Sequence, residues 1–185
     1  MKHLVLVGFM GSGKTTVGRK AARRLGLPFV DTDVLIEERA GQPIPEIFAE
    51  RGEAAFRDLE TGALEEAVSG SPSVISTGGG ALLRPQNVDI LRRNGILIHL
   101  EVDAPTVLLR TGNRKSRPLL AGHENPLERI QTLMDSRCEA YAQADVHVNT
   151  VGTQMSRVTT AAIEAWRNLG GEESLSVDVG ERVGT

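Results

Sequence analysis

The chain has 185 residues, which is close to the usual size of one domain, and it carries 21 basic against 24 acidic residues. A net charge of -3 excludes a broad positive field for nucleic acid or an anionic membrane surface, so any anion must be bound locally. The hydrophobic share of 40% and the charged share of 24% exclude a disordered or fibrous chain. A single cysteine, Cys138, cannot form an intramolecular disulfide, which predicts a reducing, cytoplasmic environment.

Short apolar runs alternate along the chain with segments of helical periodicity. Residues 4–7 are wholly apolar and end at a glycine, which predicts a strand buried on both faces of a parallel sheet. Similar runs predict four more strands, at residues 28–30, 74–76, 96–98 and 146–148. Helices are expected from residue 15 to about residue 25, and over residues 104–111, 127–142 and 156–169. The alternation predicts an α/β fold, a doubly wound five-stranded parallel sheet flanked by helices, with ligands at the carboxyl ends of the strands.

Two stretches depart from this regular alternation. Residues 112–126 (GNRKSRPLLAGHENP) are rich in glycine, proline and charge and lie between two predicted helices, which favours a mobile lid. Residues 170–185 begin with a Gly-Gly break and contain little apolar material, so we expect a loosely held tail without a catalytic role. The remaining residues, 1–169, are expected to form one domain that includes the lid.

The first predicted strand leads directly into a phosphate-binding motif. Residues 8–15 (GFMGSGKT) match GxxxxGK[ST] between a buried strand and the start of a helix, where this motif must lie. The glycines allow backbone N–H groups to turn inward onto phosphate oxygens, and the helix presents its positive N-terminus. Lys14 adds a cation at the β- and γ-phosphates, and the Thr15 hydroxyl can coordinate Mg²⁺. The motif predicts a P-loop protein and leaves GTPases, motor ATPases and kinases of nucleotides or metabolites open.

A pair of carboxylates follows the second predicted strand. Asp31 and Asp33 are two residues apart at a strand end, so both side chains are expected to point toward the phosphate crevice. One carboxylate can hold the water shell of Mg²⁺, while the other accepts a hydrogen bond from a substrate hydroxyl and helps to remove its proton. The alternative is an acidic turn or an N-cap for a helix that begins near Val34.

Six motifs in order, GFMGSGKTT, FVDTDVLIE, GEAAFRDLE, STGGGA, SRPLL and SRCEAY, resemble those of the shikimate kinase family. They extend from Leu4 to about Thr150, which is most of the chain. The resemblance implies a P-loop fold like that of the nucleoside monophosphate kinases and an ATP-dependent phosphotransferase with an alcohol acceptor. The implied reaction is the Mg²⁺-dependent transfer of the γ-phosphate of ATP to the 3-hydroxyl of shikimate, in the pathway to chorismate and the aromatic amino acids.

The resemblance also implies roles for individual residues. Guanidinium groups would bind the carboxylate of shikimate. Its hydroxyl groups would be bound by a carboxylate and by a turn of glycines. The implied residues are Asp33, Arg57, Gly78, Gly79, Gly80 and Arg137. The implied ATP-binding residues are Gly11, Ser12, Gly13, Lys14, Thr15, Thr16, Arg110 and Arg117. Asp33, Lys14 and the lid residue Arg117 would be catalytic, and Thr15 and Asp31 would hold Mg²⁺.

Some positions depart from the expected pattern or have a simpler interpretation. No aspartate closes the third predicted strand, where many P-loop proteins carry an acid that supports magnesium, so Asp31 would have to fill that role. No arginine of the kind that many family members place against the adenine follows the last strand, and Arg110 could instead stack on the base. Arg57 and Arg137 could each be a surface arginine, Arg57 paired with Glu53 or Glu60.

Rival classes remain open at this point. A kinase of gluconate or of a nucleoside monophosphate would share the fold, although an aromatic content of 3% offers few stacking surfaces for a nucleobase. A GTPase would need an NKxD-like motif, which does not follow the fourth predicted strand. A non-catalytic nucleotide-binding module is the alternative from a different class. As partners we expect ATP and shikimate, without nucleic acid or membrane, and we expect a monomer.

Overall fold

The computed structural model of the chain describes residues 1–111 and 125–172. A five-stranded sheet lies at its centre, with the strand order β2-β3-β1-β4-β5 and all neighbouring strands parallel. The strands are β1 (His3–Val7), β2 (Phe29–Asp31), β3 (Val74–Ser76), β4 (Gly95–Glu101) and β5 (Val146–Asn149). The predicted five-stranded parallel sheet is therefore confirmed.

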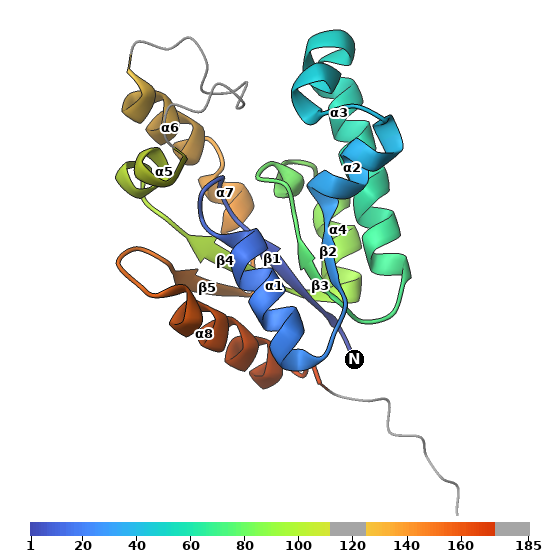
Figure 1. Cartoon of the computed structure of the whole chain (residues 1–185), viewed down its shortest axis with the longest axis vertical. Coiled ribbons are helices and arrows are strands. Elements are labelled where there is room, and N and C mark those ends of the chain that lie inside the picture. The colour runs from blue at the N-terminus through green and yellow to red at the C-terminus, as the bar shows by residue number, and fades with distance from the viewer. Residues whose placement is uncertain (112–124, 173–185) are drawn as a thin grey trace, which may run out of the picture.

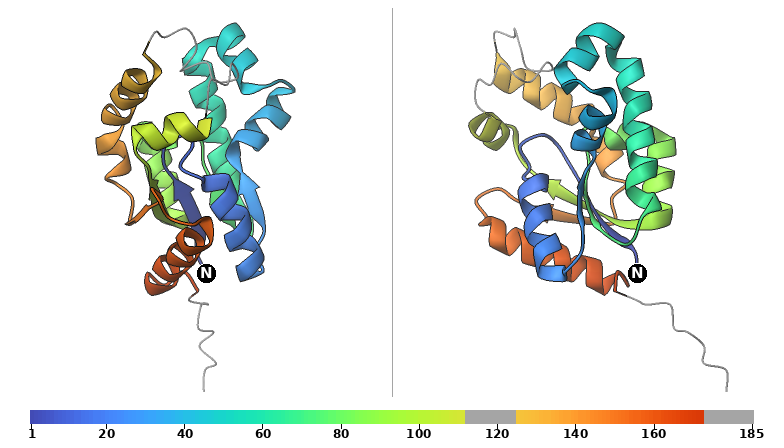
Figure 2. Two further views of the ribbon diagram at one scale, coloured as in Figure 1. Left: turned by 60° about the vertical axis from the view of Figure 1, so that its left-hand side comes forward. Right: turned by 45° about the vertical axis from the view of Figure 1, so that its right-hand side comes forward.

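Helices cover both faces of the sheet (Figure 1). Among the described residues they are α1 (Lys14–Leu25), α2 (Thr32–Ala40), α3 (Ile44–Ser69), α4 (Pro85–Asn94), α5 (Ala104–Thr111), α6 (Pro126–Asp135), α7 (Cys138–Tyr141) and α8 (Met155–Asn168), with a 3₁₀ turn at Ala81–Leu83. Figure 2 shows α1 and α8 on one side of the sheet and α3 and α4 on the other. The doubly wound arrangement predicted from the alternation of elements is confirmed.

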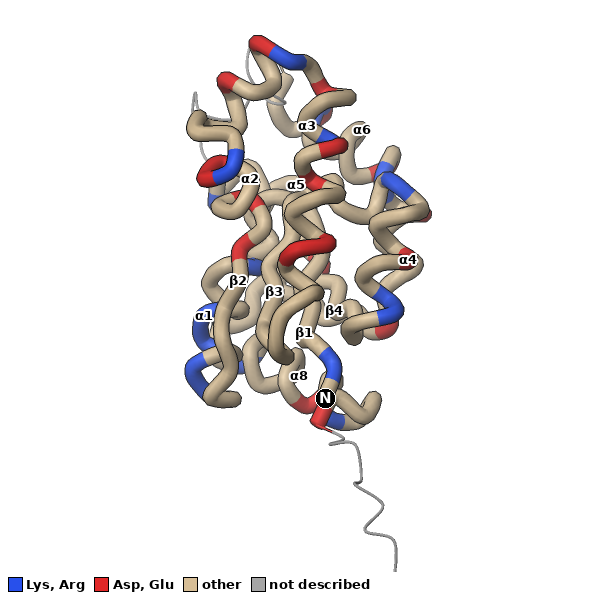
Figure 3. The backbone as a smooth tube through the Cα atoms, turned by 90° about the vertical axis from the view of Figure 1, so that its right-hand side faces the viewer, with Lys and Arg blue, Asp and Glu red and all other residues tan. Residues whose placement is uncertain are grey.

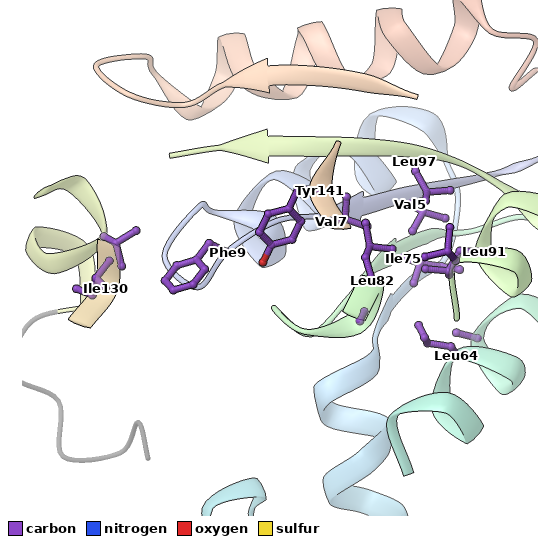
Figure 4. Close-up of a cluster of buried hydrophobic side chains, with 14 of the residues drawn as sticks. Val5, Val7, Phe9, Leu64, Ile75, Leu82, Leu91, Leu97, Ile130 and Tyr141 are labelled. Carbon is purple, nitrogen blue, oxygen red and sulfur yellow. The ribbon is translucent and has the colours of Figure 1, made fainter. Parts of the chain in front are cut away.

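Two apolar clusters hold these layers together, because side chains of a strand alternate between the faces of the sheet. Leu4 and Leu6 of β1 belong to the cluster formed with α1 and α8, whereas Val5 and Val7 belong to the opposite cluster. Figure 4 shows the opposite cluster, which also includes Ile75, Leu91, Leu97 and Tyr141. Residues 4–7 are at most 1% exposed, which confirms the strand predicted to be buried on both faces. The start of the phosphate loop is thereby fixed.

Two pairs of helices extend beyond the carboxyl edge of the sheet (Figure 1). On one side are α2 and the first part of α3, and on the other are α5 and α6. Helix α3 bends at Gly52, whose φ of 77° is a left-handed conformation that favours glycine. A small apolar cluster of Ile36, Ile47, Phe56 and Ala63 packs α2 against α3. The two pairs frame the carboxyl ends of the strands, where ligands bind in open α/β sheets.

One predicted helix is wrong in its extent. The sequence predicts a single helix over residues 127–142, but the structure has two helices, α6 and α7, that are separated at Ser136 and Arg137. Arg137 has φ −112° and ψ 0° and precedes α7 as its N-cap. Apolar residues such as Leu133 and Tyr141 pack against the same core cluster on both sides of the break. The hydrophobic periodicity therefore continues across the break and conceals it.

The two irregular stretches predicted from the sequence lie largely outside the described residues. Of the predicted lid, residues 112–126, the structure describes Asn125, whose side chain caps α6, and Pro126. Of the predicted tail, residues 170–185, it describes the first three residues. The carbonyl of Gly171 accepts a hydrogen bond from Lys2 N at 3.1 Å, and Gly171 is buried against Trp166. The chain is thus anchored beyond residue 169.

Helix α1 carries exposed basic residues, whose positions along the backbone are blue in Figure 3. They are Arg19, Lys20, Arg23 and Arg24. They lie opposite the apolar stripe of α1, which includes Val17 and Ala21, as expected for the solvated face of an amphipathic helix. None of the helices in the described part of the chain is both long and apolar enough to cross a membrane.

Candidate active site

A pocket of about 810 Å³ opens at the carboxyl ends of β1, β2 and β3. Most of the predicted site residues line it: Gly11, Gly13, Lys14, Thr15, Thr16, Asp31, Asp33, Arg57, Gly78, Gly79, Gly80, Arg110 and Arg137. Ser12 does not, because its side chain is fully buried within the loop. The predicted lid residue Arg117 lies outside the described residues. The fold thus assembles motifs that are far apart in the sequence into one pocket.

The phosphate loop forms one wall of this pocket. Gly8, Gly11 and Gly13 have φ values of 139°, 75° and 98°, which residues with a side chain rarely adopt. Among the described residues no side chain caps the N-terminus of α1, so its first N–H groups are available to an anion. The ammonium group of Lys14 donates to the carbonyls of Gly8 at 2.7 Å and Phe9 at 3.0 Å. The loop therefore curls around the Lys14 ammonium group, and the start of α1 leaves backbone N–H groups for an anion.

Thr15 and Asp31 meet where β2 passes the start of α1. The Thr15 hydroxyl donates to Asp31 Oδ2 at 3.0 Å, and Asp31 Oδ1 accepts the N–H of Asp33 at 3.2 Å. Asp31 thereby caps α2, as the alternative interpretation of the sequence predicts, while its other oxygen faces the phosphate loop. A hydroxyl and a carboxylate are hard oxygen ligands of the kind that Mg²⁺ prefers, so the residues present fit this ion.

Asp33 lies in the first turn of α2 and lines the pocket. Burial raises the pKa of Asp33 from 3.8 to about 6, the Asp31 carboxylate adds to this rise, and the Lys14 ammonium opposes it. A carboxyl group with such a pKa can accept a proton at neutral pH and release it again. Asp33 is therefore suited to contact a hydroxyl group that loses its proton.

Arg57 lies on α3 and is paired with two carboxylates of its own helix. Its Nη1 donates to Glu60 Oε2 at 2.8 Å, and its Nη2 donates to Glu53 Oε1 at 3.0 Å. Burial alone would lower the pKa of Arg57, but Glu60 and then Glu53 hold it above its ordinary value. The ion pairs expected of a surface arginine are thus present, yet Arg57 is only 8% exposed and lines the pocket.

Two glycines after β3 make room for these charged side chains. A Cβ atom at Gly78 would lie 2.8 Å from both Asp33 Oδ1 and Glu60 Oε1. A Cβ atom at Gly80 would overlap the guanidinium group of Arg57. Both contacts are shorter than a carbon atom can make without displacing its neighbours. The glycine turn therefore allows two carboxylates and a guanidinium group to converge on one point of the pocket.

Gly79 fixes the second guanidinium group. Its carbonyl accepts hydrogen bonds from Arg137 Nη1 at 3.0 Å and from the Tyr141 hydroxyl at 2.6 Å. The guanidinium carbon of Arg137 also lies 5.3 Å from the centre of the Phe9 ring, a distance at which cation–π attraction is effective. The break between α6 and α7 places Arg137 in this position. Arg57 and Arg137 thus contact consecutive residues of the same turn.

The similarity of the chain to known proteins identifies its family. A sequence model of the shikimate kinase family matches residues 10–167. The shikimate kinase of Moorella thermoacetica is 46% identical over 167 residues, which cover 89% of this chain and 95% of that relative. The chain belongs to the shikimate kinase family. The shikimate kinase of Geobacter sulfurreducens is 44% identical over 159 residues, with 86% of this chain and 87% of the relative covered.

Solved structures of the shikimate kinase family agree with this assignment. The shikimate kinase from Acinetobacter baumannii in complex with shikimate matches with a TM-score of 0.85 at 35% identity, and the match covers 94% of this chain and 96% of that chain. A gluconokinase from Sinorhizobium meliloti matches with a TM-score of 0.55 at 18% identity, over 92% of this chain and 94% of that chain, and so shares the fold alone. The resemblance inferred from the six motifs and the P-loop kinase fold are both confirmed.

Arg110, expected from the family resemblance to contact ATP, lies at the rim of the pocket. Its Nη1 donates to the carbonyl of Gly11 at 3.0 Å, and its Nη2 donates to the carbonyl of Thr150 at 2.9 Å. These bonds tie α5 to the phosphate loop and to the segment that follows β5. Stacking of Arg110 on the adenine stays a prediction.

Two residues important to the geometry of this shikimate kinase site were not predicted as site residues from the sequence. Glu60 is fully buried, and within the described parts of the chain its Oε1 has no hydrogen-bond partner. Tyr141 is held through its hydroxyl by Gly79, and burial raises the pKa of Tyr141 to about 12. Both lie inside motifs that carry the resemblance, GEAAFRDLE and SRCEAY. From the sequence, Glu60 was considered only as an ion-pair partner of Arg57, which lies three residues before it.

Proposed function

We propose that this member of the shikimate kinase family transfers the γ-phosphate of ATP to the 3-hydroxyl of shikimate, with Mg²⁺ held at Thr15 and Asp31. The observation that carries the proposal is the convergence of two buried guanidinium groups, Arg57 and Arg137, beside the phosphate loop. A small polyhydroxylated acid needs fixed cations for its carboxylate, and guanidinium groups match that geometry. The solved relative that contains shikimate supports this acceptor.

Asp33 would align the accepting hydroxyl group. The carboxyl lies between the phosphate loop and the glycine turn, within the influence of Lys14 on one side and Glu60 on the other. Phosphoryl transfer through a loose transition state needs little base catalysis, so the main role of Asp33 is positioning. Its raised pKa lets it take up the hydroxyl proton as the bond to phosphorus forms.

The phosphate loop would bind and orient the donor. Backbone N–H groups and the Lys14 ammonium would hold the β- and γ-phosphates, and the Thr15 hydroxyl would turn from Asp31 toward the metal. When bound, Mg²⁺ neutralises charge on the phosphate oxygens during transfer. The role of Arg117 in closing over the phosphates stays a prediction.

The test of this function is the release of ADP from ATP and Mg²⁺ with different acceptors. Shikimate, gluconate, a nucleoside monophosphate and no acceptor are compared, and we expect stimulation by shikimate alone. Formation of shikimate 3-phosphate, followed by ³¹P NMR, identifies the product. Stimulation by another acceptor would retain the kinase and overturn the assignment of the two arginines. Turnover with none of them would favour the non-catalytic nucleotide-binding module.

A conservative variant tests the acceptor pocket without removing a buried charge. Arg57→Lys keeps the positive charge beside Glu60 but loses the planar fork that binds a carboxylate. We expect the KM for shikimate to rise about 10-fold to 100-fold, as for the loss of a hydrogen bond to a charged group, with the KM for ATP nearly unchanged. Arg84→Lys is the matched control, because Arg84 pairs with Asp58 and does not line the pocket. Equal losses for both substrates would contradict the assignment.

A further inference from the structure

A second cluster of metal-ligating side chains lies on the sheet, apart from the pocket. His99 and Glu101 are two residues apart on β4, so they share one face of the sheet. His147 on β5 is the direct cross-strand neighbour of His99. None of the three residues lines the candidate active site. The cluster lies at the sheet edge, because β5 is the last strand in the sheet order (Figure 1).

The three ligand atoms are spaced like the ligands of one metal ion. His147 Nδ1 lies 3.1 Å from His99 Nδ1 and 3.3 Å from Glu101 Oε1, and all three atoms lie within 4.8 Å of one another. Two ligands at about 2.0–2.1 Å from a tetrahedral Zn²⁺ are separated by about 3.3 Å. The side chains of His147 and Glu101 are 38% and 48% exposed, so water can complete the coordination.

The orientation of His99 suits a ligand. Its ring stacks on Tyr141, with centroids 4.6 Å apart and planes 16° apart, and lies edge-on to the ring of His147. The stacking on Tyr141 holds the imidazole of His99 in place, with its Nδ1 at 3.1 Å from Nδ1 of His147.

We propose that His99, Glu101 and His147 form a site for a divalent transition-metal ion such as Zn²⁺. Two imidazole nitrogens and one carboxylate favour zinc and its neighbours in the first transition row over Mg²⁺ or Ca²⁺, which prefer oxygen ligands alone. The bound ion ties the edge strand β5 to β4. Thr150, which follows β5, donates to the carbonyl of Glu101 at 2.8 Å and accepts a hydrogen bond from Arg110. The metal therefore steadies the strand end that holds Arg110.

The competing interpretation needs no metal. A protonated His147 would form an ion pair with Glu101, and its ring would share a hydrogen bond with His99. Such a cluster would use the same contacts but would bind no ion. Metal titration separates the two.

The experiment is the titration of the full chain with Zn²⁺ by calorimetry, in excess Mg²⁺ to occupy the oxygen ligands of the phosphate loop. We expect one Zn²⁺ per chain. His147→Ala and Glu101→Gln should each weaken the affinity for Zn²⁺. The loss of a residue that only supports a metal ligand costs about 10-fold to 100-fold in affinity, and the loss of a direct ligand should cost more. Two control variants should bind Zn²⁺ as the unaltered chain does: Glu65→Gln, at an exposed position of α3, and Cys138→Ser, which removes the only thiol.

Two further readouts keep the proposal testable if one variant folds poorly. Zn²⁺ should raise the Tm of the unaltered chain and of the controls but not that of Glu101→Gln. Co²⁺ should give the intense visible absorption of a four-coordinate site, and this band should be absent in His147→Ala. The absence of binding, or equal binding by the unaltered chain and both ligand variants, would overturn the site and leave the ion-pair cluster.

Discussion

Replacing Asp33 by asparagine is expected to stabilise the unliganded protein, although it removes the group proposed to align the acceptor. Folding raises the pKa of Asp33 from 3.8 to about 6, because the carboxyl becomes buried and lies near Asp31. The charged form is therefore less favourable in the folded protein than in the unfolded chain. Asparagine has nearly the same shape and carries no charge, so Asp33→Asn removes this penalty.

The size of the effect follows from the two pKa values. Below about pH 3.8 both states are protonated and Asp33 costs no stability, whereas above about pH 6 both states are ionised and the full penalty is present. The difference corresponds to up to about 3 kcal/mol at pH 7.5 and about 1.5 kcal/mol at pH 5. The gain in the free energy of unfolding should therefore grow between about pH 3.8 and about pH 6 and level off above that.

The assay is urea unfolding without nucleotide or metal, followed by circular dichroism at pH 5 and pH 7.5. Asp89→Asn is the matched control, because Asp89 is exposed on α4 and surface substitutions change stability by only about 0.5 kcal/mol or less. An Asp33→Asn variant that is no more stable than the unaltered chain at pH 7.5 would refute the reasoning. So would a gain that is the same at both pH values, since it would not arise from the titration of Asp33.

Three further predictions follow from the same geometry. For the unaltered enzyme, kcat/KM for shikimate should rise with pH and level off above about 6, as the Asp33 carboxyl of the free enzyme ionises; a flat profile between pH 5 and pH 7 would contradict this role. Gly80→Ala should raise the KM for shikimate and leave the KM for ATP nearly unchanged, since the new methyl group would displace the Arg57 guanidinium. Gly171→Ala should lower the free energy of unfolding by about 1–3 kcal/mol, because its methyl group would overlap the Trp166 indole. Gly70→Ala is the control for both glycine variants in denaturation and steady-state assays, because no atom of the described residues lies within 4 Å of a Cβ atom placed there.

The parts of the fold that the sequence predicted are those in which local pattern and burial agree. The strand at residues 4–7 is apolar throughout because α1 and α8 cover one face and the opposite cluster covers the other. The phosphate motif was recognisable because its glycines occupy positions with positive φ that few other residues tolerate. Both signals are encoded within a few consecutive residues.

The parts that the sequence did not predict depend on contacts between distant segments. The break before α7 was concealed because residues on both sides of it keep the apolar spacing of one helix. The hydrogen bond from Arg137 to Gly79 joins residues that are 58 positions apart, and nothing in either local pattern specifies it. Its place in the motif SRCEAY, which family resemblance supplied, was the only indication that Arg137 belongs to the site.

Among the described residues, the two buried arginines of the pocket differ in their anionic partners. Lys14 acts on Asp33, and Arg57 is paired with the buried Glu60. Arg137 instead donates to the carbonyl of Gly79, and within the described residues it forms no ion pair. Burying a second guanidinium group beside Arg57 is unfavourable unless negative charge lies nearby, and Glu60 supplies part of it for both arginines. A ligand with a single carboxylate would supply the rest, whereas a neutral sugar or polyol would leave Arg137 uncompensated. This difference in charge favours an acidic acceptor.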